Sequence, residues 1–462
     1  MSPAELPAAS ELRVFGSRAG AHLFVVDGSR VYDLDPRDAA AIQHLLEGTD
    51  PASALSEPAL WAALGLAPDL GDRRRIDGTP LPPPPLRSLS LNVAQSCNMS
   101  CHYCYADAGR FGGRARMMAL EVAEAAVDRL VQEAEPGACL VLGFMGGEPL
   151  LNRALVHHAT RYGARVAAEA GRRMRFSITT NATLLTAEDA ALFAEFPWSV
   201  QVSIDGDRAA NDAARPLNGG GGSYDRILDS LRLMDREGRP RHLAARATVT
   251  PRTGELLPIL DHLIALGFDE VGFAAVVVSP SPAHAFGPDD FARFLEGMIA
   301  CGTRALGEIG AGRPYPFGNF ETAMREIHRG THRPYPCGAG AAYLSANAEG
   351  RLFACHRLID DEGFAMGDVY GGSDKAARAA HLVARHVDRM EPCRGCWARY
   401  LCGGGCYHEV SRRGRIGCDY IRGWLDFCLG AYVELMAARP EYFAGAPMDA
   451  TEWTSSPTTL AS

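Results

Sequence analysis

The chain has 462 residues, of which 47% are hydrophobic and 22% are charged. This length exceeds what one hydrophobic core usually supports, so we expect a globular protein of two or three domains. The net charge of −9 argues against a nucleic-acid-binding protein, whose contact surface would be basic. No stretch offers the roughly twenty apolar residues of a membrane span, and the N-terminal residues lack the pattern of a secretory signal. These features predict a cytoplasmic protein, in which the thirteen cysteines would be metal or cluster ligands rather than disulfides.

Residues 1–76 are predicted to form a small domain. Apolar runs at 23–26 and 31–34 flank Asp27-Gly28, which predicts a β-hairpin, and Asp35-Pro36 predicts a helix that runs to Leu46. Two shorter helices are expected near 52–55 and 59–64. This order resembles the winged-helix-like domain in front of many peptide-modifying enzymes, which implies capture of a leader peptide by β-augmentation. The alternative is an accessory domain with only a packing role.

Residues 77–87 contain the run DGTPLPPPP, which predicts a semi-rigid linker between domains. From 88 to 330 the pattern alternates between strands and helices, and apolar positions from Leu120 to Val131 share one helix face. Six such units predict a parallel, barrel-like sheet whose chemistry lies on the loops that follow the strands. The expected strands are 89–93, 140–144, 176–180, 200–204, 245–249 and 271–274.

Three cysteines follow the first of these strands directly. Cys97, Cys101 and Cys104 have the spacing CxxxCxxC and are followed by Tyr105. Thiolates are the usual ligands of iron–sulfur clusters, and three of them leave the fourth iron of a four-iron cluster open to a substrate. The alternative is a structural zinc site that recruits His102.

The spacing, the order and the trailing tyrosine resemble the cluster loop of the radical SAM enzymes. The resemblance implies that Cys97, Cys101 and Cys104 hold a [4Fe-4S] cluster that binds S-adenosylmethionine (SAM) and cleaves it reductively, giving a radical that abstracts hydrogen from a substrate carbon. Gly146-Gly147-Glu148-Pro149, after the second strand, resembles the motif that holds the methionine amino group of SAM, with Glu148 facing a cation. By the same resemblance Ser177, Thr179 and Asn181 lie near the ribose, Ser203 near the methionine end and Arg215 near the carboxylate of SAM. Each of these could instead anchor a loop.

Other features of this region are expected to carry no chemistry. The run Asn218 to Ser223, NGGGGS, lacks the ending of a phosphate loop and predicts a flexible loop. His157 and His158 are expected on a helix surface. Cys139 and Cys301 are isolated thiols to which we assign no role.

Eight further cysteines occur between 337 and 428. Their order, together with a hairpin predicted to turn at Glu349-Gly350, resembles the SPASM domain, the auxiliary-cluster module of peptide-modifying radical SAM enzymes, over residues 331–443. The resemblance implies one cluster on Cys337, Cys355 and Cys406, and a second on Cys393, Cys396, Cys402 and Cys418. Cys428 departs from the seven-cysteine pattern: it either completes the first auxiliary cluster or is a spare thiol. A zinc ribbon at 393–406 is the alternative.

Four stretches narrow the resemblance to the thioether-forming members of this family: 329–337 (RGTHRPYPC), 354–357 (ACHR), 396–406 (CWARYLCGGGC) and 418–424 (CDYIRGW). Such enzymes join a cysteine sulfur to a carbon within a small protein or peptide that carries a leader segment. The resemblance implies an α/β fold with a partial (β/α)6 barrel, three [4Fe-4S] clusters, SAM, and an external electron donor such as flavodoxin or ferredoxin. No nucleic acid or membrane partner is expected.

Two other functions remain open. The chain could mature another peptide, including sulfatase-type oxidation of a cysteine or serine, because the SPASM pattern serves both. More remotely, it could be a non-catalytic iron–sulfur or zinc protein. Residues 444–462 are rich in Ala, Thr, Ser and Pro, and we expect a disordered tail without chemistry.

Overall fold

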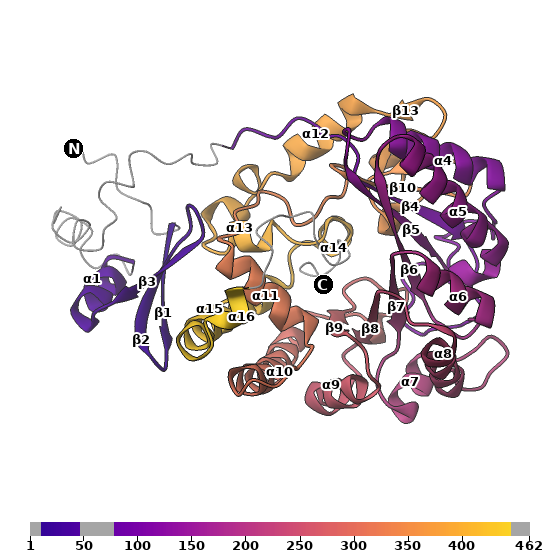
Figure 1. Cartoon of the computed structure of the whole chain (residues 1–462). Coiled ribbons are helices and arrows are strands. Elements are labelled where there is room, and N and C mark those ends of the chain that lie inside the picture. Colours follow the sequence, from indigo (N-terminus) through magenta and orange to yellow (C-terminus); the bar gives the residue numbers. More distant parts are fainter. Residues whose placement is uncertain (1–10, 47–77, 445–462) are drawn as a thin grey trace.

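The computed structural model describes residues 11–46 and 78–444. The short helices predicted near 52–55 and 59–64, and the predicted tail after Ala444, lie outside the described residues. The described parts contain a three-stranded sheet near the N-terminus and a ten-stranded sheet that carries most of the chain (Figure 1). None of the described helices combines the length and the apolar character needed to cross a membrane.

The N-terminal sheet is antiparallel and has the order β1-β2-β3. Its strands are β1 (Leu12–Ser17), β2 (Gly20–Val25) and β3 (Arg30–Leu34), and helix α1 (Pro36–Leu46) follows. The predicted hairpin at Asp27-Gly28 and the helix from Pro36 are confirmed, whereas β1 was not predicted. A small core of its own holds this unit together: Leu12, Leu23, Val25, Leu34 and Ile42.

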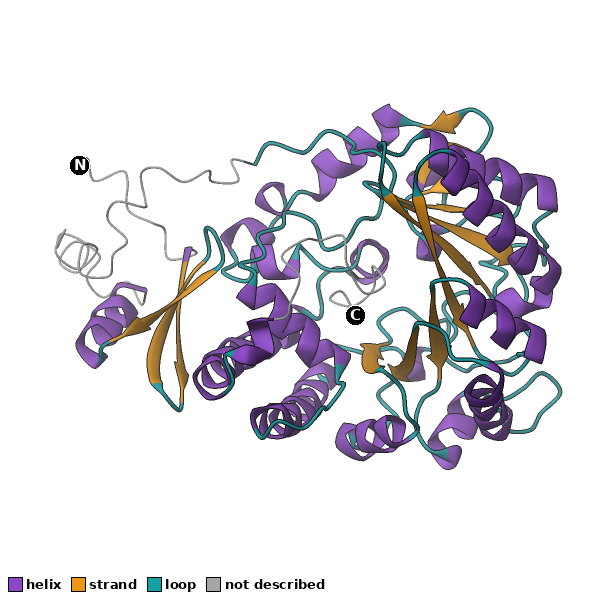
Figure 2. Cartoon of the chain, in the orientation of Figure 1, coloured by secondary structure: helices purple, strands orange, loops and turns teal. Residues whose placement is uncertain are grey.

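The six strands predicted for residues 88–330 are confirmed. They pair in parallel and in chain order: β4 (Ser88–Ala94), β5 (Cys139–Gly146), β6 (Arg173–Thr180), β7 (Trp198–Ser203), β8 (His242–Val249) and β9 (Glu270–Ala275). Helices cover the outer face of this sheet, as Figure 2 shows: α4 (Leu120–Gln132), α5 (Arg153–Glu169), α6 (Ala187–Glu195), α7 (Arg208–Ala214), α8 (Tyr224–Glu237) and α9 (Leu256–Ala265).

Alternation along the strands separates the two faces of the sheet. On β4 and β5 the side chains of Leu89, Leu91, Leu142 and Phe144 are fully buried and belong to the main core. The residues between them are small or polar, since every second residue of a strand points to the opposite face. Helix α4 packs through Ala123, Ala126, Val127, Leu130 and Val131, but Leu120, predicted on the same face, is 42% exposed.

The large sheet continues beyond residue 330. Strand β10 (Tyr343–Ala346) pairs in parallel with β4, on the side opposite β5, and β11 (Arg351–Phe353) returns antiparallel to β10 through the predicted turn at Glu349-Gly350. The sheet ends with β12 (Ala365–Asp368) and β13 (Gly372–Ser373). The strand that precedes the first cysteine loop and the first strand of the C-terminal region are therefore hydrogen-bonded neighbours.

The remaining helices lie on the inner side of the barrel and toward the N-terminal sheet (Figure 1). They are α10 (Asp290–Gly310), α11 (Gly318–His328), α12 (Lys375–Arg385), α13 (Arg399–Cys402), α14 (Tyr407–Arg413), α15 (Cys418–Ala438) and α16 (Glu441–Ala444). Short 3₁₀ helices occur at Pro149–Asn152 (η3), Pro282–His284, His356–Leu358, Glu362–Phe364, Val387–Arg389 and Cys393–Gly395.

Two contacts fasten the N-terminal parts to the C-terminal region. The Arg399 guanidinium donates to both carboxylate oxygens of Glu11 over 2.5 and 2.6 Å, and the Phe24 ring lies 6.1 Å from that of Trp397. The proline-rich segment is also held: Arg389 donates to the Gly78 carbonyl oxygen over 2.8 Å, and Leu86 is fully buried. Residues 78–87 thus run along the C-terminal region.

Candidate active site

One cavity of about 930 Å³ lies against the inner face of the large sheet. It is lined by alternate residues of the strands, such as Ser88 and Ser90 of β4 or Arg173 and Arg175 of β6, which is the pattern of a single sheet face. Most of the predicted site residues line this one cavity: Cys97, Cys101, Cys104, Gly146, Gly147, Ser177, Thr179, Asn181, Ser203, Arg215 and Cys337. The structure therefore brings together residues from six segments that lie apart in the sequence.

The three cysteines after β4 are close enough to influence one another. Burial raises the pKa of Cys97 to about 12, and nearby Cys101 and Cys104 add to the effect. Burial likewise raises the pKa of Cys101, which the Arg215 guanidinium opposes. Three half-buried thiols cannot easily ionise together unless positive charge lies among them. A cationic iron–sulfur core bound by three thiolates supplies such charge, so this group of donors fits the cluster that the spacing predicts.

Asparagines hold the Cys97 loop in place. The Asn181 amide nitrogen lies 3.8 Å from Cys97 Sγ, and Asn218 Nδ2 donates to the Cys97 carbonyl oxygen over 2.9 Å. Asn218 also accepts from the Ser100 hydroxyl. The prediction of a flexible loop at 218–223 is wrong at both ends, because Asn218 binds the cysteine loop and the fully buried Ser223 donates to the Arg215 carbonyl oxygen over 2.8 Å.

Arg215 is positioned by a pair of residues that the sequence did not single out. Tyr103 donates its hydroxyl hydrogen to Asp205 over 2.6 Å, and the Arg215 guanidinium donates to the Tyr103 hydroxyl oxygen over 2.5 Å. Arg215 is 6% exposed, lies 3.9 Å from the Asp205 carboxylate, and its Nε has no hydrogen-bond partner. The only sequence signals were the place of Tyr103 between two cysteines and that of Asp205 just after a strand.

The paired glycines are required by the cysteine loop itself. A Cβ at Gly146 would collide with the Ala94 carbonyl oxygen, and one at Gly147 would collide with the Ser96 carbonyl oxygen. The Gly147 amide donates to the Ala94 oxygen over 2.8 Å. The close approach that the glycines allow therefore joins the loop after β5 to the loop after β4.

Glu148 does not line the cavity, contrary to the prediction that it faces a cation. Its side chain is fully buried and accepts hydrogen bonds from the Leu150 amide (3.1 Å), the Thr180 hydroxyl (2.7 Å) and the Asn181 amide (2.8 Å). Burial raises the pKa of Glu148, and these three donors oppose the rise. The carboxylate links η3 to the end of β6, which fixes Asn181 beside the cysteine loop.

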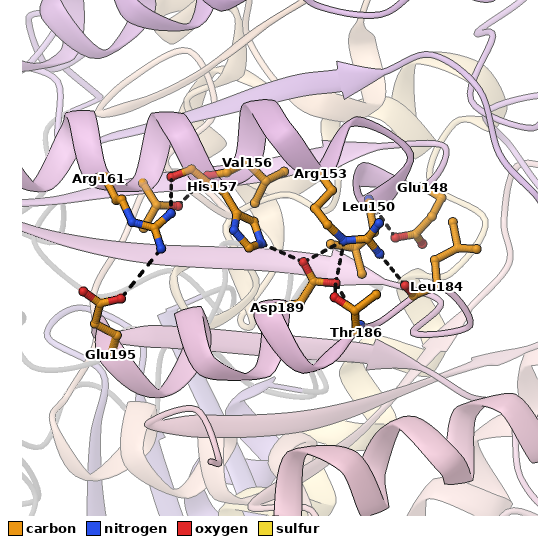
Figure 3. Close-up of polar contacts among 11 residues, drawn as sticks. Glu148, Leu150, Arg153, Val156, His157, Arg161, Leu184, Thr186, Asp189 and Glu195 are labelled. Carbon is orange, nitrogen blue, oxygen red and sulfur yellow. Dashed lines mark hydrogen bonds and ion pairs between the residues drawn. The ribbon is translucent and has the colours of Figure 1, made fainter. Parts of the chain in front are cut away.

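A second carboxylate supports the same loops from the outer side of the sheet (Figure 3). Asp189, fully buried at the start of α6, accepts from Arg153 Nε over 2.8 and 2.9 Å, and His157 Nε2 lies 2.8 Å from its Oδ1. Burial opposes ionisation, but the bonds from His157 and Arg153 lower the pKa of Asp189. The prediction that His157 lies on a helix surface is therefore wrong, whereas His158 is 41% exposed.

Cys337, Cys355 and Cys406 lie close together as a second group. Burial raises the pKa of Cys337 to about 11, and it raises the pKa of Cys355, to which nearby Cys337 and Cys406 contribute. Arg357 lies beside this group: it donates to Glu409 over 2.8 Å, and its guanidinium carbon is 5.3 Å from the centre of the Tyr105 ring. The first cysteine loop thus contacts the second group through Tyr105.

Cys393, Cys396, Cys402 and Cys418 form a third group around a smaller cavity of about 110 Å³. Burial raises the pKa of Cys393 to about 11, and the other three thiols add to the rise. Cys428 does not join either C-terminal group: it is fully buried on α15, it lines neither cavity, and burial alone raises its pKa. The helical rise alone separates it from Cys418 by about 15 Å. Its predicted role as a cluster ligand is therefore corrected.

The cysteines of each described group do not converge on a single point. Among residues 11–46 and 78–444, no three His, Cys, Asp or Glu side chains converge as the ligands of a single metal ion would. A structural zinc ion needs thiolates about 2.3 Å away on all sides, whereas a four-iron core is larger. Of the two isolated thiols, Cys139 lines the far end of the large cavity, and burial raises the pKa of Cys301 to about 12.

Comparisons with known proteins agree with this arrangement. The family model "Radical SAM superfamily" matches residues 91–263. An uncharacterized protein of Archaeoglobus fulgidus is 29% identical over 335 residues, which cover 70% of this chain and 75% of that protein. The serine-type anaerobic sulfatase-maturating enzyme of Klebsiella aerogenes is 23% identical over 368 residues, which cover 75% of this chain and 86% of the enzyme.

Solved structures share the fold. The structure of native anSMEcpe with bound AdoMet matches with a TM-score of 0.64 at 16% identity, covering 76% of this chain and 100% of that one. Streptococcus suis SuiB bound to precursor peptide SuiA matches with a TM-score of 0.52 at 14% identity, covering 88% and 97%. The family match spans the strands and loops that build the cavity, from β4 to α9. Residues 91–263 therefore match the radical SAM superfamily, whose members use a [4Fe-4S] cluster and SAM, and the chain is similar in sequence to an anaerobic sulfatase-maturating enzyme.

Proposed function

We propose that this enzyme is a peptide maturase that forms thioether bonds between a cysteine sulfur and a carbon of the same small protein or peptide. The observation that carries the proposal is that one cavity joins the Cys97 loop to Cys337 of the second cysteine group. In this proposal Cys97, Cys101 and Cys104 hold the cluster that binds SAM. When bound and reduced, such a cluster splits SAM into methionine and a carbon radical that removes a hydrogen atom from the substrate.

The chain's own residues bind and orient the reactants. Arg215, held by Tyr103 with its Nε unpaired, is suited to a carboxylate such as that of SAM. Ser177, Thr179 and Ser203 project from neighbouring strands into the cavity and offer hydroxyl groups. Asn181 is fixed by its backbone bond to Glu148. Placing SAM and the target C–H bond together in a cavity that excludes bulk water is the main contribution of the protein.

We infer that the two C-terminal groups hold auxiliary [4Fe-4S] clusters. Four thiols, Cys393, Cys396, Cys402 and Cys418, would complete one cluster. Cys337, Cys355 and Cys406 are three, and because Cys428 lies apart, one position of that cluster would stay open. Because Cys337 lines the large cavity, a cluster held by this group would lie beside the substrate, where its metal would lower the pKa of a substrate thiol.

The atom balance of thioether formation is simple. The C–H and S–H bonds are lost and a C–S bond is formed, so the substrate loses two hydrogens and keeps its sulfur. One hydrogen atom would go to the carbon radical derived from SAM and one proton to solvent, and an auxiliary cluster held by the C-terminal cysteines would accept the remaining electron. An external donor such as flavodoxin or ferredoxin would supply the electron that starts each cycle.

The finer substrate assignment rests on sequence resemblance. The stretches at 329–337, 396–406 and 418–424 look most like those of the maturases of quinohemoprotein amine dehydrogenase, whose small subunit carries thioether cross-links. The N-terminal sheet and α1 support capture of a leader segment, since an antiparallel sheet edge can accept one more strand. We therefore propose that small subunit as the substrate.

Sulfatase-type oxidation is the second candidate, and one observation favours it: the relative from Klebsiella aerogenes is a sulfatase-maturating enzyme. Mass spectrometry after anaerobic incubation with SAM, a strong reductant and the candidate substrate separates the two reactions. A thioether removes two hydrogens per bond and leaves its cysteine unable to react with a thiol reagent. Oxidation of serine also removes two hydrogens but gives an aldehyde and leaves the cysteines free, whereas oxidation of cysteine to formylglycine loses the sulfur. Iron and sulfide counting comes first, because zinc without sulfide, or a loaded protein that never releases 5′-deoxyadenosine, contradicts the enzymatic proposal.

A further inference from the structure

The wall of the large cavity has the opposite charge to the chain as a whole. Nine arginines and three glutamates line it, and neither lysine nor aspartate occurs among its described lining residues. The complete chain carries a net charge of −9. A basic concave surface concentrates the electrostatic field. In an acidic protein it therefore attracts anionic ligands more strongly than the remaining surface does.

Three of these arginines belong to the site described above. Arg215 is bound to Tyr103, and Arg357 is bound to Glu409. Arg246, on β8, is 9% exposed, and burial lowers its pKa to about 10. These three lie at the end of the cavity where the cysteine loops are, and their contacts with the protein are already extensive.

Six further arginines line the rest of the cavity, from the far edge of the sheet to the neighbourhood of Cys337. Strands β4 to β6 are parallel, and Cys97 lies beyond the last residue of β4. Arg87, which precedes β4, and Arg173, the first residue of β6, therefore lie at the edge of the sheet away from Cys97. The loop after α11 reaches this edge, because the Arg87 amide donates to the Ala342 carbonyl oxygen over 2.9 Å. We call the six together the basic mouth: Arg87, Arg173, Arg175, Arg325, Arg329 and Arg333.

Two glutamates line the basic mouth beside its six arginines. Glu135 lies 3.3 Å from Arg87, and Glu326 lies 3.4 Å from Arg333; these are the two glutamates that line this end. Both members of the Arg87–Glu135 pair are 53% exposed, so the mouth opens to solvent, where such a pair adds little stability and exchanges partners readily. The end of the cavity that a substrate would enter thus carries an excess of positive charge.

The basic mouth and the end of the cavity near Cys97 are separated by roughly the length of strand β6. From Arg173 to Thr179 strand β6 advances six residues, or about 20 Å at 3.3 Å per residue. An extended peptide covers the same distance with about six residues. A substrate residue at the cysteine end would therefore place its sequence neighbours, about six positions away, among the arginines.

We propose that the basic mouth binds an acidic segment of the peptide substrate, a run of aspartate or glutamate residues about six positions from the residue that reacts. The inference rests on the proposed function, because it takes the occupant of the cavity to be a peptide. Guanidinium groups pair with carboxylates through two parallel hydrogen bonds, which fixes the register of a peptide as well as attracting it. The basic mouth thereby selects the substrate and sets which residue reaches SAM.

The test is equilibrium binding to the cluster-loaded enzyme with SAM and without reductant. The probe is a fluorescent peptide that carries a cysteine and, about six residues away, a run of aspartates; the matched peptide has asparagines instead. We expect the aspartate peptide to bind at least about tenfold more tightly at low salt, and the difference to shrink as salt rises. Equal affinity for the two peptides would overturn the inference.

Substitutions of individual arginines test whether the preference for the aspartate peptide comes from the basic mouth. Arg173→Gln with Arg325→Gln should remove most of the preference for aspartate, whereas Arg173→Lys with Arg325→Lys should keep most of it, because charge is retained. Arg165→Gln with Arg232→Gln is the matched control, since these side chains are 57% and 66% exposed on the outer helices α5 and α8. Loss of the preference in the control pair, or its persistence in the first pair, contradicts the basic mouth.

Failure of this inference and failure of the proposed function give different results. Binding is measured without SAM cleavage, so it does not depend on the chemistry. Release of 5′-deoxyadenosine without any preference for the aspartate peptide would remove the basic mouth and leave the enzymatic proposal standing. A strong preference in a protein that never cleaves SAM would do the reverse.

Discussion

Asn218 donates from its side-chain amide to the carbonyl oxygen of Cys97 over 2.9 Å, although 121 positions separate the two residues in the sequence. The loop that follows α7 is thereby fastened to the loop that follows β4. The Asn218 side chain also accepts a hydrogen bond from the Ser100 hydroxyl. In addition, the backbone amide of Asn218 donates to the Asn98 carbonyl oxygen over 3.0 Å. One side chain and its own backbone therefore hold three residues of the cysteine loop.

Replacement of Asn218 should loosen the iron bound by this loop. Asn218→Ala removes two side-chain hydrogen bonds, each worth about 1 kcal/mol, so we expect a chelator to extract iron from the Cys97 loop at least about fivefold faster. The measurement is the loss of that part of the cluster absorbance which a variant lacking Cys97, Cys101 and Cys104 does not show. Asp229→Ala, at a side chain that is 74% exposed on α8, is the control. Equal rates for Asn218→Ala and the wild type would show that the loop does not need this anchor.

The iron content should distinguish Cys428 from its neighbours. Cys406→Ala removes a member of the second cysteine group, so we expect anaerobically reconstituted protein to lose about four iron atoms. Cys428→Ala should bind as much iron and sulfide as the wild type. The Cys428 side chain is fully buried on α15, away from the two C-terminal cysteine groups. A loss of iron in Cys428→Ala would contradict this position and make Cys428 the fourth ligand.

The pair Arg399 and Glu11 should hold the N-terminal sheet to the C-terminal region. Arg399 is 5% exposed and makes two charge-assisted bonds to Glu11, so Arg399→Ala should cost about 1.5–3 kcal/mol locally. We expect amide hydrogens of β1 and β2 to exchange about tenfold faster or more, as measured by mass spectrometry. Arg37→Ala, at an exposed position on α1, is the matched control and should leave these rates unchanged. Equal exchange in both variants would show that other contacts dock the sheet.

Stability should fall as pH rises from about 4.5 to about 7 because of Glu321 on α11. Burial, with nearby Glu270 adding to it, raises the pKa of Glu321 from 4.5 to about 7. Within that window the folded protein keeps a proton that the unfolded chain has released, so stability is lost as pH rises, by at most about 3 kcal/mol in total.

The matched experiment uses Glu321→Gln, which cannot ionise. We expect its urea midpoint to exceed that of the wild type at pH 8 and the two to converge near pH 4.5, where the native carboxyl is protonated. Glu237→Gln, at an exposed position on α8, controls for the loss of one acidic residue. A variant that stays below the wild type at pH 8 would contradict the sign of this effect.

The parallel strands were predictable because their signal is local. Each one is a short apolar run after a helical repeat, and the six predicted runs all coincide with β4 to β9. The first cysteine group followed from spacing within one loop, whereas the two C-terminal groupings came from the resemblance to the SPASM domain. By contrast, the pairing of β10 with β4 joins Leu344 to Leu89 across some 250 positions, and no periodicity within either strand selects that partner.

The wrong predictions concern polar side chains whose role depends on contacts with residues from other segments. Glu148 follows two glycines, as a ligand-binding residue would, yet its carboxylate turns into the protein toward Thr180 and Asn181. The sequence places His157 on a solvent-facing position of a helix. In the structure α6 places Asp189 beside it. Burial of a carboxylate requires donors from elsewhere in the fold, and a sequence read along the chain does not reveal them.

The strand that carries the first cysteine loop has a hydrogen-bonded partner on each side, β5 from its own barrel and β10 from beyond residue 330. A fragment that ends at residue 330 would leave β4 as an exposed edge strand, with a row of unpaired backbone groups next to its cysteines. Such a truncated barrel would be prone to aggregate and to misplace the loop that follows β4. The two regions should therefore be expressed, evolved and engineered as one piece.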